Sequence, residues 1–212
     1  MGSGKGRGSL IVFEGCDRCG KSTQTQLLTQ GLQAEGIDAE LIRFPDRTTS
    51  TGRLIDEYLK QSTELSDQTI HLLFSANRWE AEKVIKQKLS SGVTLVVDRY
   101  AFSGVAFTAA KGLCLNWCKG PDVGLPAPDA LFFLDLRPDK ALGRGGFGQE
   151  RYENLQFQQK VYDTFKKLQD CTWINFDASD TVDKLKNEIL LKSLEIIKKT
   201  KDSPILGLWT CA

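Results

Sequence analysis

The sequence lacks several features that would place it in other classes of protein. No apolar run among its 212 residues approaches the ~20 residues that a membrane-spanning helix needs. Its 28 basic residues nearly balance its 27 acidic ones, unlike the excess of positive charge in most nucleic-acid-binding domains. We therefore exclude membrane insertion and expect no nucleic-acid partner.

Histidine is almost absent, and the six cysteines make a poor metal site. Cys16 and Cys19 have the spacing of a redox pair or of half a zinc site, but zinc would need two further ligands. The nearest other pair, Cys114 and Cys118, lies far away and has helical spacing. No apolar signal-peptide core precedes the cysteines, so we expect free thiols in the reducing cytoplasm, with nuclear and mitochondrial pools left open.

Short apolar segments alternate with longer helical patterns, which predicts repeated β-α-β units. We expect strands at 10–13, 39–44, 94–98, 130–136 and 173–177, and helices at 21–35, 51–61, 66–90, 103–119, 155–169 and 182–199. The strands are almost continuously apolar, as in sheets that are covered on both faces. The predicted fold is α/β, a doubly wound five-stranded parallel sheet with helices on both faces.

Two polar, glycine-rich segments lie outside this pattern. We expect residues 1–8 to form a flexible N-terminal arm, residues 9–212 to form a single domain, and residues 137–154 to form a mobile flap within it.

The stretch GCDRCGKST, residues 15–23, follows the first predicted strand and opens the first predicted helix. Gly15 and Gly20 let the backbone curl so that its N–H groups point inward, and Lys21 can reach the β- and γ-phosphates of a nucleotide. The hydroxyl of Ser22 can bind Mg²⁺. This context favours a phosphate-binding loop over a two-cysteine site, in which case the cysteines are only small residues tolerated in a tight loop.

Charged residues follow two other predicted strands. Asp98 could hold a Mg²⁺-bound water beside the phosphate loop, and Arg99 and Arg47 could converge on a second phosphate. An ordinary strand-end ion pair is the alternative for Asp98 and Arg99.

An aromatic ring and a guanidinium lie one turn apart on the third predicted helix. Phe74 and Arg78 would suit the stacking face and the edge of a nucleobase. The alternative is a core phenylalanine beside a surface charge, and spacing alone does not separate the two.

Together these stretches resemble the thymidylate kinase family of P-loop nucleoside monophosphate kinases, and its eukaryotic branch in particular. The matching segments extend from Ser9 to Trp209 and include LIRFPDRTTSTG, LLFSANRWE, DRYAFSGVAFTAAKG, GLPAPDALFFLDL and FGQERYE, besides the phosphate loop. Cys16 and Cys19 depart from the small aliphatic residues expected in the family's loop.

The resemblance implies a homodimeric, Mg²⁺-dependent enzyme that transfers the γ-phosphate of ATP to dTMP, giving dTDP and ADP for dTTP synthesis. It implies that the ATP-binding residues are Gly15, Cys16, Asp17, Arg18, Cys19, Gly20, Lys21, Ser22 and Thr23, with Arg144 packing on adenine. Arg18, Lys21 and Asp98 would be catalytic, and Ser22 and Asp98 would hold the metal. A flap arginine such as Arg151 is the alternative to Arg18.

The resemblance also implies how the acceptor is bound. Arg78 would donate to O4 of thymine while Phe74 stacks on the ring, and Arg47 and Arg99 would grip the phosphate. The sugar side would be formed by Asp17, which accepts from the 3′-hydroxyl, together with Phe44, Phe107 and Tyr152. Gly104 would be a further substrate-binding residue.

Two other functions compete with this interpretation. A different P-loop nucleotide or deoxynucleoside kinase would share the loop, but two arginines on the acceptor side argue against an acceptor without a phosphate. A nucleotide-binding switch that hydrolyses ATP slowly would not need the Phe74 and Arg78 pair.

Overall fold

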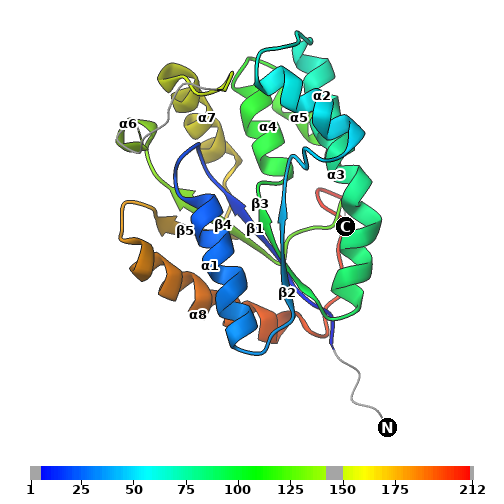
Figure 1. Cartoon of the computed structure of the whole chain (residues 1–212), viewed down its shortest axis with the longest axis vertical. Helices are drawn as coiled ribbons and strands as arrows, with labels where there is room; N and C mark the ends of the chain where they lie inside the picture. Colours follow the sequence, from blue (N-terminus) through cyan, green and yellow to red (C-terminus); the bar gives the residue numbers. More distant parts are fainter. Residues whose placement is uncertain (1–5, 142–149, 211–212) are drawn as a thin grey trace.

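The structure, a computed structural model, describes residues 6–141 and 150–210. Within these residues five strands form one parallel sheet in the order β2-β3-β1-β4-β5 (Figure 1). The strands are β1 (Leu10–Glu14), β2 (Ala39–Arg43), β3 (Thr94–Asp98), β4 (Ala130–Asp135) and β5 (Trp173–Asp177). The predicted five-stranded, all-parallel α/β fold is confirmed.

Helices cover both faces of the sheet, as the apolar strands predict (Figure 1). One face packs against α1 (Lys21–Ala34) and α8 (Val182–Thr200), and the buried cluster there includes Ile11 and Phe13 of β1. The alternate residues of β1, Leu10 and Val12, face α3 (Asp67–Ser90), α4 (Ala101–Ala109) and α7 (Leu155–Leu168). Because successive side chains of β1 point to opposite faces of the sheet, the strand contributes to two separate cores.

The predicted helix at 103–119 is wrong as a single element. The chain forms α4 and then a separate short helix, α5 (Leu115–Lys119), which is followed by the 3₁₀ turn η1 (Gly120–Asp122). Gly112, between the two helices, has a φ of +104°, which an α-helix does not accommodate.

Helix α2 (Ser50–Leu59) packs on α3 through a small third cluster that includes Ile55 and Ile70.

The two predicted mobile segments contain packed residues. Arg7 forms an ion pair with Asp129, and Gly8 N donates to Leu89 O at 2.8 Å. The expected flap begins with a short helix, α6 (Pro138–Ala141), whose first and last residues are buried. Residues 1–5 and 142–149, including Arg144, lie outside the described residues, so the flexible arm, the mobile flap and the extent of the single domain stay predictions.

No helix in the described ranges is both long enough and apolar enough to cross a membrane.

Candidate active site

The phosphate loop connects β1 to α1 at the carboxyl edge of the sheet. Lys21 is buried, and its Nζ donates to Gly15 O at 3.0 Å and to Cys16 O at 2.6 Å. These bonds hold the ammonium group inside the curve of the loop. The N-terminus of α1 follows directly, and it adds partial positive charge to the same site.

The two loop cysteines point into different cores. Cys16 packs with the cluster under α4 and α7, whereas Cys19 packs with the cluster under α1 and α8, and each is only 1% exposed. Both are free thiols. Burial, and then the neighbouring Cys19, raise the pKa of Cys16 well above its ordinary value.

The surroundings of the cysteines argue against the rival interpretation of the loop. The two free thiols pack in different hydrophobic clusters, and Lys21 Nζ donates to Cys19 Sγ at 3.4 Å. In the part of the chain that the structure describes, no group of three or more His, Cys, Asp or Glu side chains could hold a metal.

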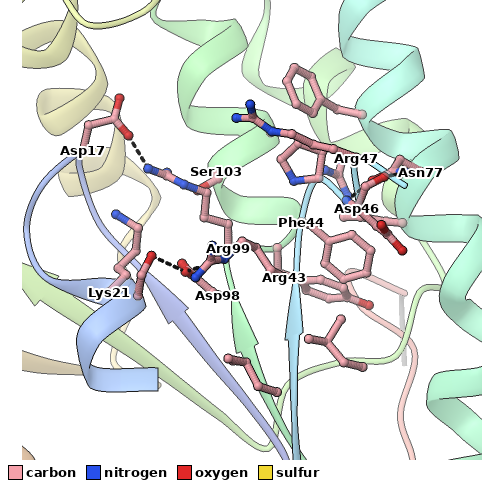
Figure 2. A pocket seen from close by; sticks show the side chains of 18 of the residues that line it. Asp17, Lys21, Arg43, Phe44, Asp46, Arg47, Asn77, Asp98, Arg99 and Ser103 are labelled. Carbon is pink, nitrogen blue, oxygen red and sulfur yellow. Dashed lines mark hydrogen bonds and ion pairs between the residues drawn. The ribbon is translucent and has the colours of Figure 1, made fainter. Parts of the chain in front are cut away.

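The end of β3 brings Asp98 to the loop. Ser22 Oγ donates to Asp98 Oδ2 at 2.7 Å, and Arg43 Nε donates to the same oxygen at 3.1 Å (Figure 2). A hydroxyl and a carboxylate therefore lie together beside Lys21. Oxygen atoms of these two kinds are suitable ligands for Mg²⁺.

Asp17 and Arg99 join the loop to the next part of the site. They form an ion pair, which Figure 2 shows as a dashed line beyond the ends of the strands. Burial lowers the pKa of Arg99, but the charges of Asp17, Asp98 and Glu14 outweigh it, so that the pKa is raised overall. Arg99 is therefore fully charged.

The same two turns carry unusual backbone conformations. Arg18 has a φ of 61° and Arg99 a φ of 69°, both in the left-handed region that non-glycine residues rarely adopt. Such residues cluster at ligand-binding sites, where surrounding contacts hold them in place.

Gln158 and Glu14 are functional candidates that the sequence interpretation missed. Gln158 of α7 accepts from Asp17 N at 3.0 Å and donates to Asp17 Oδ2 at 2.5 Å. Buried Glu14 accepts from Tyr100 N and Ser103 N, each at 2.9 Å, and so caps the start of α4. In the sequence, the only local signs of a functional role are that Gln158 is a polar residue at a core position of α7 and that Glu14 is a charged residue at the end of an apolar strand.

Arg47 lies in the loop after β2, which α3 holds in place. Its guanidinium pairs with Asp56 at 2.7 Å and with Glu150 at 2.8 Å. Asn77 of α3, another missed residue, accepts from Asp46 N at 2.7 Å and donates to Asp46 O at 3.1 Å (Figure 2).

Arg78 and Phe74 line the inner end of the site. Arg78 is 2% exposed and forms a two-point ion pair with Asp122, a residue that no motif indicated. Arg78 is therefore not the surface charge that the alternative interpretation supposes. Phe74 is half-buried, and it packs against the small cluster between α2 and α3.

Phe107 and Tyr152 form one wall. Their ring centroids lie 5.5 Å apart, and Arg99 lies 5.4 Å above the Phe107 ring. Lys111 Nζ donates to the hydroxyl of Tyr152 at 2.8 Å, which fixes the far end of that ring.

One cavity of about 1580 Å³ connects these groups. Most of the predicted site residues line it, namely Asp17, Arg18, Cys19, Gly20, Lys21, Ser22, Thr23, Phe44, Arg47, Phe74, Arg78, Asp98, Arg99, Gly104, Phe107 and Tyr152. Gly15 and Cys16 of the same loop do not line the cavity, but their carbonyl groups accept from Lys21. Arg144 falls outside the described residues. The loop that holds Lys21 and an aromatic, arginine-lined end thus share one space.

The two candidate catalytic arginines have different surroundings. Arg18 Nη2 lies 2.9 Å from Glu153 Oε1, and both residues line the cavity. Arg151 pairs with Glu64 and lies 4.1 Å above the Tyr58 ring, so it packs on the end of α2 instead.

Known proteins match this chain over nearly its whole length. A family model described as thymidylate kinase matches residues 13–189. Thymidylate kinases of Danio rerio and Homo sapiens are 53% and 51% identical to it, each over 96% of this chain and 98% of the relative. A solved thymidylate kinase structure from Candida albicans has a TM-score of 0.87 and 39% identity, and the match covers 95% of this chain and 98% of that one. On the family model and on these full-length relatives, the chain belongs to the thymidylate kinase family.

Proposed function

We propose that this protein is a thymidylate kinase, which transfers the γ-phosphate of ATP to dTMP and yields dTDP and ADP for dTTP synthesis. The observation that carries the proposal is the single cavity that runs from the phosphate loop to Arg78. Donor and acceptor must meet in one space if a phosphoryl group is to pass directly between them.

The donor end would bind the phosphates of ATP through the loop backbone and Lys21, and Arg144 would pack on adenine. Ser22 and Asp98 would hold Mg²⁺, which the 2.7 Å contact between their oxygens supports. When bound, Mg²⁺ neutralises the charge on the transferring phosphate oxygens. Arg18 would act on the same charge. It lines the cavity, whereas Arg151 pairs with Glu64 and is not among the lining residues, which supports Arg18 over Arg151.

The acceptor end would bind the phosphate of dTMP through Arg47 and Arg99. Both arginines line the cavity and already pair with carboxylates, which supports the binding of an anion beside them. Asp17 would accept from the 3′-hydroxyl, while Phe44, Phe107 and Tyr152 would enclose the sugar. Gly104 would contact the substrate beside Arg78. This second anion site favours a nucleotide acceptor over a nucleoside.

Thymine would lie between Phe74 and Arg78. A carbonyl at position 4 accepts from the guanidinium, whereas the amino group of cytosine would face it with another donor. The enzyme would then discriminate against cytosine because binding it leaves a guanidinium N–H of Arg78 desolvated and unpaired.

We also propose a homodimer and a cytoplasmic location. Large apolar side chains that include Leu54 of α2 and Leu72 of α3 are exposed, which supports a covered helical face. Sedimentation equilibrium would test the dimer, and imaging of a tagged protein would test the location.

The decisive experiment is ADP release from ATP and Mg²⁺ with different acceptors. The monophosphates of deoxythymidine, deoxyuridine, deoxycytidine and deoxyguanosine should be compared, with thymidine as the phosphate-free control. We expect the strongest stimulation by dTMP and none by thymidine. Stimulation by thymidine would identify a nucleoside kinase, and no stimulation by any acceptor would contradict the proposal.

A further inference from the structure

A buried carboxylate holds the guanidinium that is expected to recognise the base. Arg78 Nε lies 3.0 Å from Asp122 Oδ1, and Arg78 Nη2 lies 2.5 Å from Asp122 Oδ2. Arg78 comes from the middle of α3, whereas Asp122 ends the 3₁₀ turn after α5. Their exposed fractions are 2% and 0%, so water does not weaken the pair.

The carboxylate is itself fixed by α3. Ser75, one turn before Arg78, donates from Oγ to Asp122 Oδ1 at 2.8 Å. The same hydroxyl lies 3.0 Å from Pro121 O. Both oxygens of Asp122 are therefore bonded to one helix, and the direction of the carboxylate is set.

Helix α4 closes the other side of the guanidinium. A Cβ atom added at Gly104 would lie 2.9 Å from Arg78 Nη2 and 3.2 Å from Nη1. The group is thus confined between Asp122 and the backbone of α4. Within the described residues, Nη1 donates to no protein atom, and Arg78 and Gly104 both line the cavity.

A hydrogen-bond donor on a side chain discriminates between bases only if the side chain cannot rotate away from the base. A fixed N–H donates to a carbonyl oxygen and opposes an amino group, but a mobile guanidinium would turn aside and tolerate both. Arginine side chains are long and have many rotamers, so this restraint must come from the surroundings.

We infer that Asp122 is a positioning residue that sets the base preference of the enzyme by immobilising Arg78. The inference rests on the proposed function, since it concerns how that acceptor pocket selects thymine over cytosine. Asp122 affects the base preference only through its contact with Arg78 and not through contact with the substrate.

The test is Asp122→Asn, which keeps the size but places an amide N–H₂ against a guanidinium donor. We expect kcat/KM for dTMP to fall about 10- to 100-fold, mainly through the KM for dTMP. The KM for ATP should not change. The preference for dTMP over dCMP should narrow by about tenfold or more, because the freed guanidinium no longer opposes an amino group.

Asp129→Asn is the matched control. It makes the same chemical change in an ion pair, with Arg7, that lies outside the cavity, and it should leave the base preference intact. In an Arg78→Leu background, adding Asp122→Asn should have no further effect on preference. If Asp122→Asn does not fold, Ser75→Ala provides the second variant, with an expected narrowing of about 2- to 10-fold.

Each result has a distinct meaning. Equal losses for dTMP and dCMP, with the preference retained, would overturn the inference and leave Asp122 a purely structural role. A further loss of preference in the Arg78→Leu background would also overturn it. A wild-type enzyme without dTMP-dependent ADP release would instead overturn the proposed function, and the inference with it.

Discussion

Arg18 of the phosphate loop forms an ion pair with Glu153, and the two charged groups are 2.9 Å apart. The pair bridges the loop to the last residues of the expected flap. Arg151, only two residues before Glu153, is directed instead to Glu64 and Tyr58. Neighbouring residues at the end of the flap therefore contact different parts of the molecule.

This difference predicts which arginine acts in catalysis. Arg18→Ala should lower kcat by about 10²- to 10³-fold, because a guanidinium aimed at the moving phosphoryl group stabilises charge that develops in the transition state. Arg151→Ala is the control and should change kcat by less than about tenfold, which steady-state ADP release would measure. A large loss for Arg151→Ala with near-normal kcat for Arg18→Ala would reverse the assignment.

The missing methyl group of deoxyuridine monophosphate should weaken that acceptor without excluding it. One methyl in an apolar pocket is worth about 1–3 kcal/mol of transition-state binding. Under identical conditions, the kcat/KM for dUMP should accordingly lie about 10- to 200-fold below that for dTMP. Equal values would mean that the pocket does not contact the methyl group.

Asn77 should matter for the acceptor and not for ATP. Its side chain holds both backbone groups of Asp46, next to Arg47, and donates to Thr49 Oγ1 at 3.0 Å. Asn77→Ala should cost about 1–3 kcal/mol of unfolding free energy and raise the KM for dTMP, because the loop that carries Arg47 loosens. Exposed Asn116 on α5 offers a matched control, Asn116→Ala. A rise in the KM for ATP alone would contradict this role.

The thiols should react in a definite order. Cys114 is exposed, and backbone N–H groups of Trp117 and Asn116 lower its pKa, whereas burial raises the pKa of Cys16. Iodoacetamide at pH 8 should therefore label Cys114 well before Cys16, as peptide mass spectrometry would record. Enzyme labelled only at Cys114 should keep its activity. Equally fast labelling of Cys16 would show that the phosphate loop opens.

Glu14 should give stability a distinctive pH dependence. Burial raises the pKa of its carboxyl above the ordinary value of 4.5, although hydrogen bonds from Ser103 oppose the shift. A raised folded-state pKa contributes stability below pH 4.5 that is lost as the pH rises through the folded value. The side chain of the Glu14→Gln variant does not ionise. The free energy of unfolding of the wild type should therefore fall relative to that of the variant between pH 4 and neutrality. Urea unfolding of both proteins across that range would measure the difference, and the opposite slope would show that the hydrogen bonds dominate.

Local patterns in the sequence were enough to predict the sheet and the phosphate loop. Apolar runs such as Leu10 to Phe13 indicate strands covered on both faces, and a glycine-rich turn before Lys21 indicates a phosphate site. Both signals extend over a few consecutive residues, so they need no knowledge of distant contacts. The predicted helix at 103–119 failed because Gly112, with its positive φ, divides an otherwise helical pattern.

Tertiary structure alone decided which side chains support those residues. Asp122 lies 44 positions from Arg78, and Gln158 lies 141 positions from Asp17, so no local periodicity connects either pair. The two loop cysteines likewise shared a redox spacing until the fold placed them in different cores. The residue types that bind phosphate follow from local sequence, because a motif is a short-range property. The partners that orient them follow only from the packing of α3, α7 and the turn after α5 around one cavity.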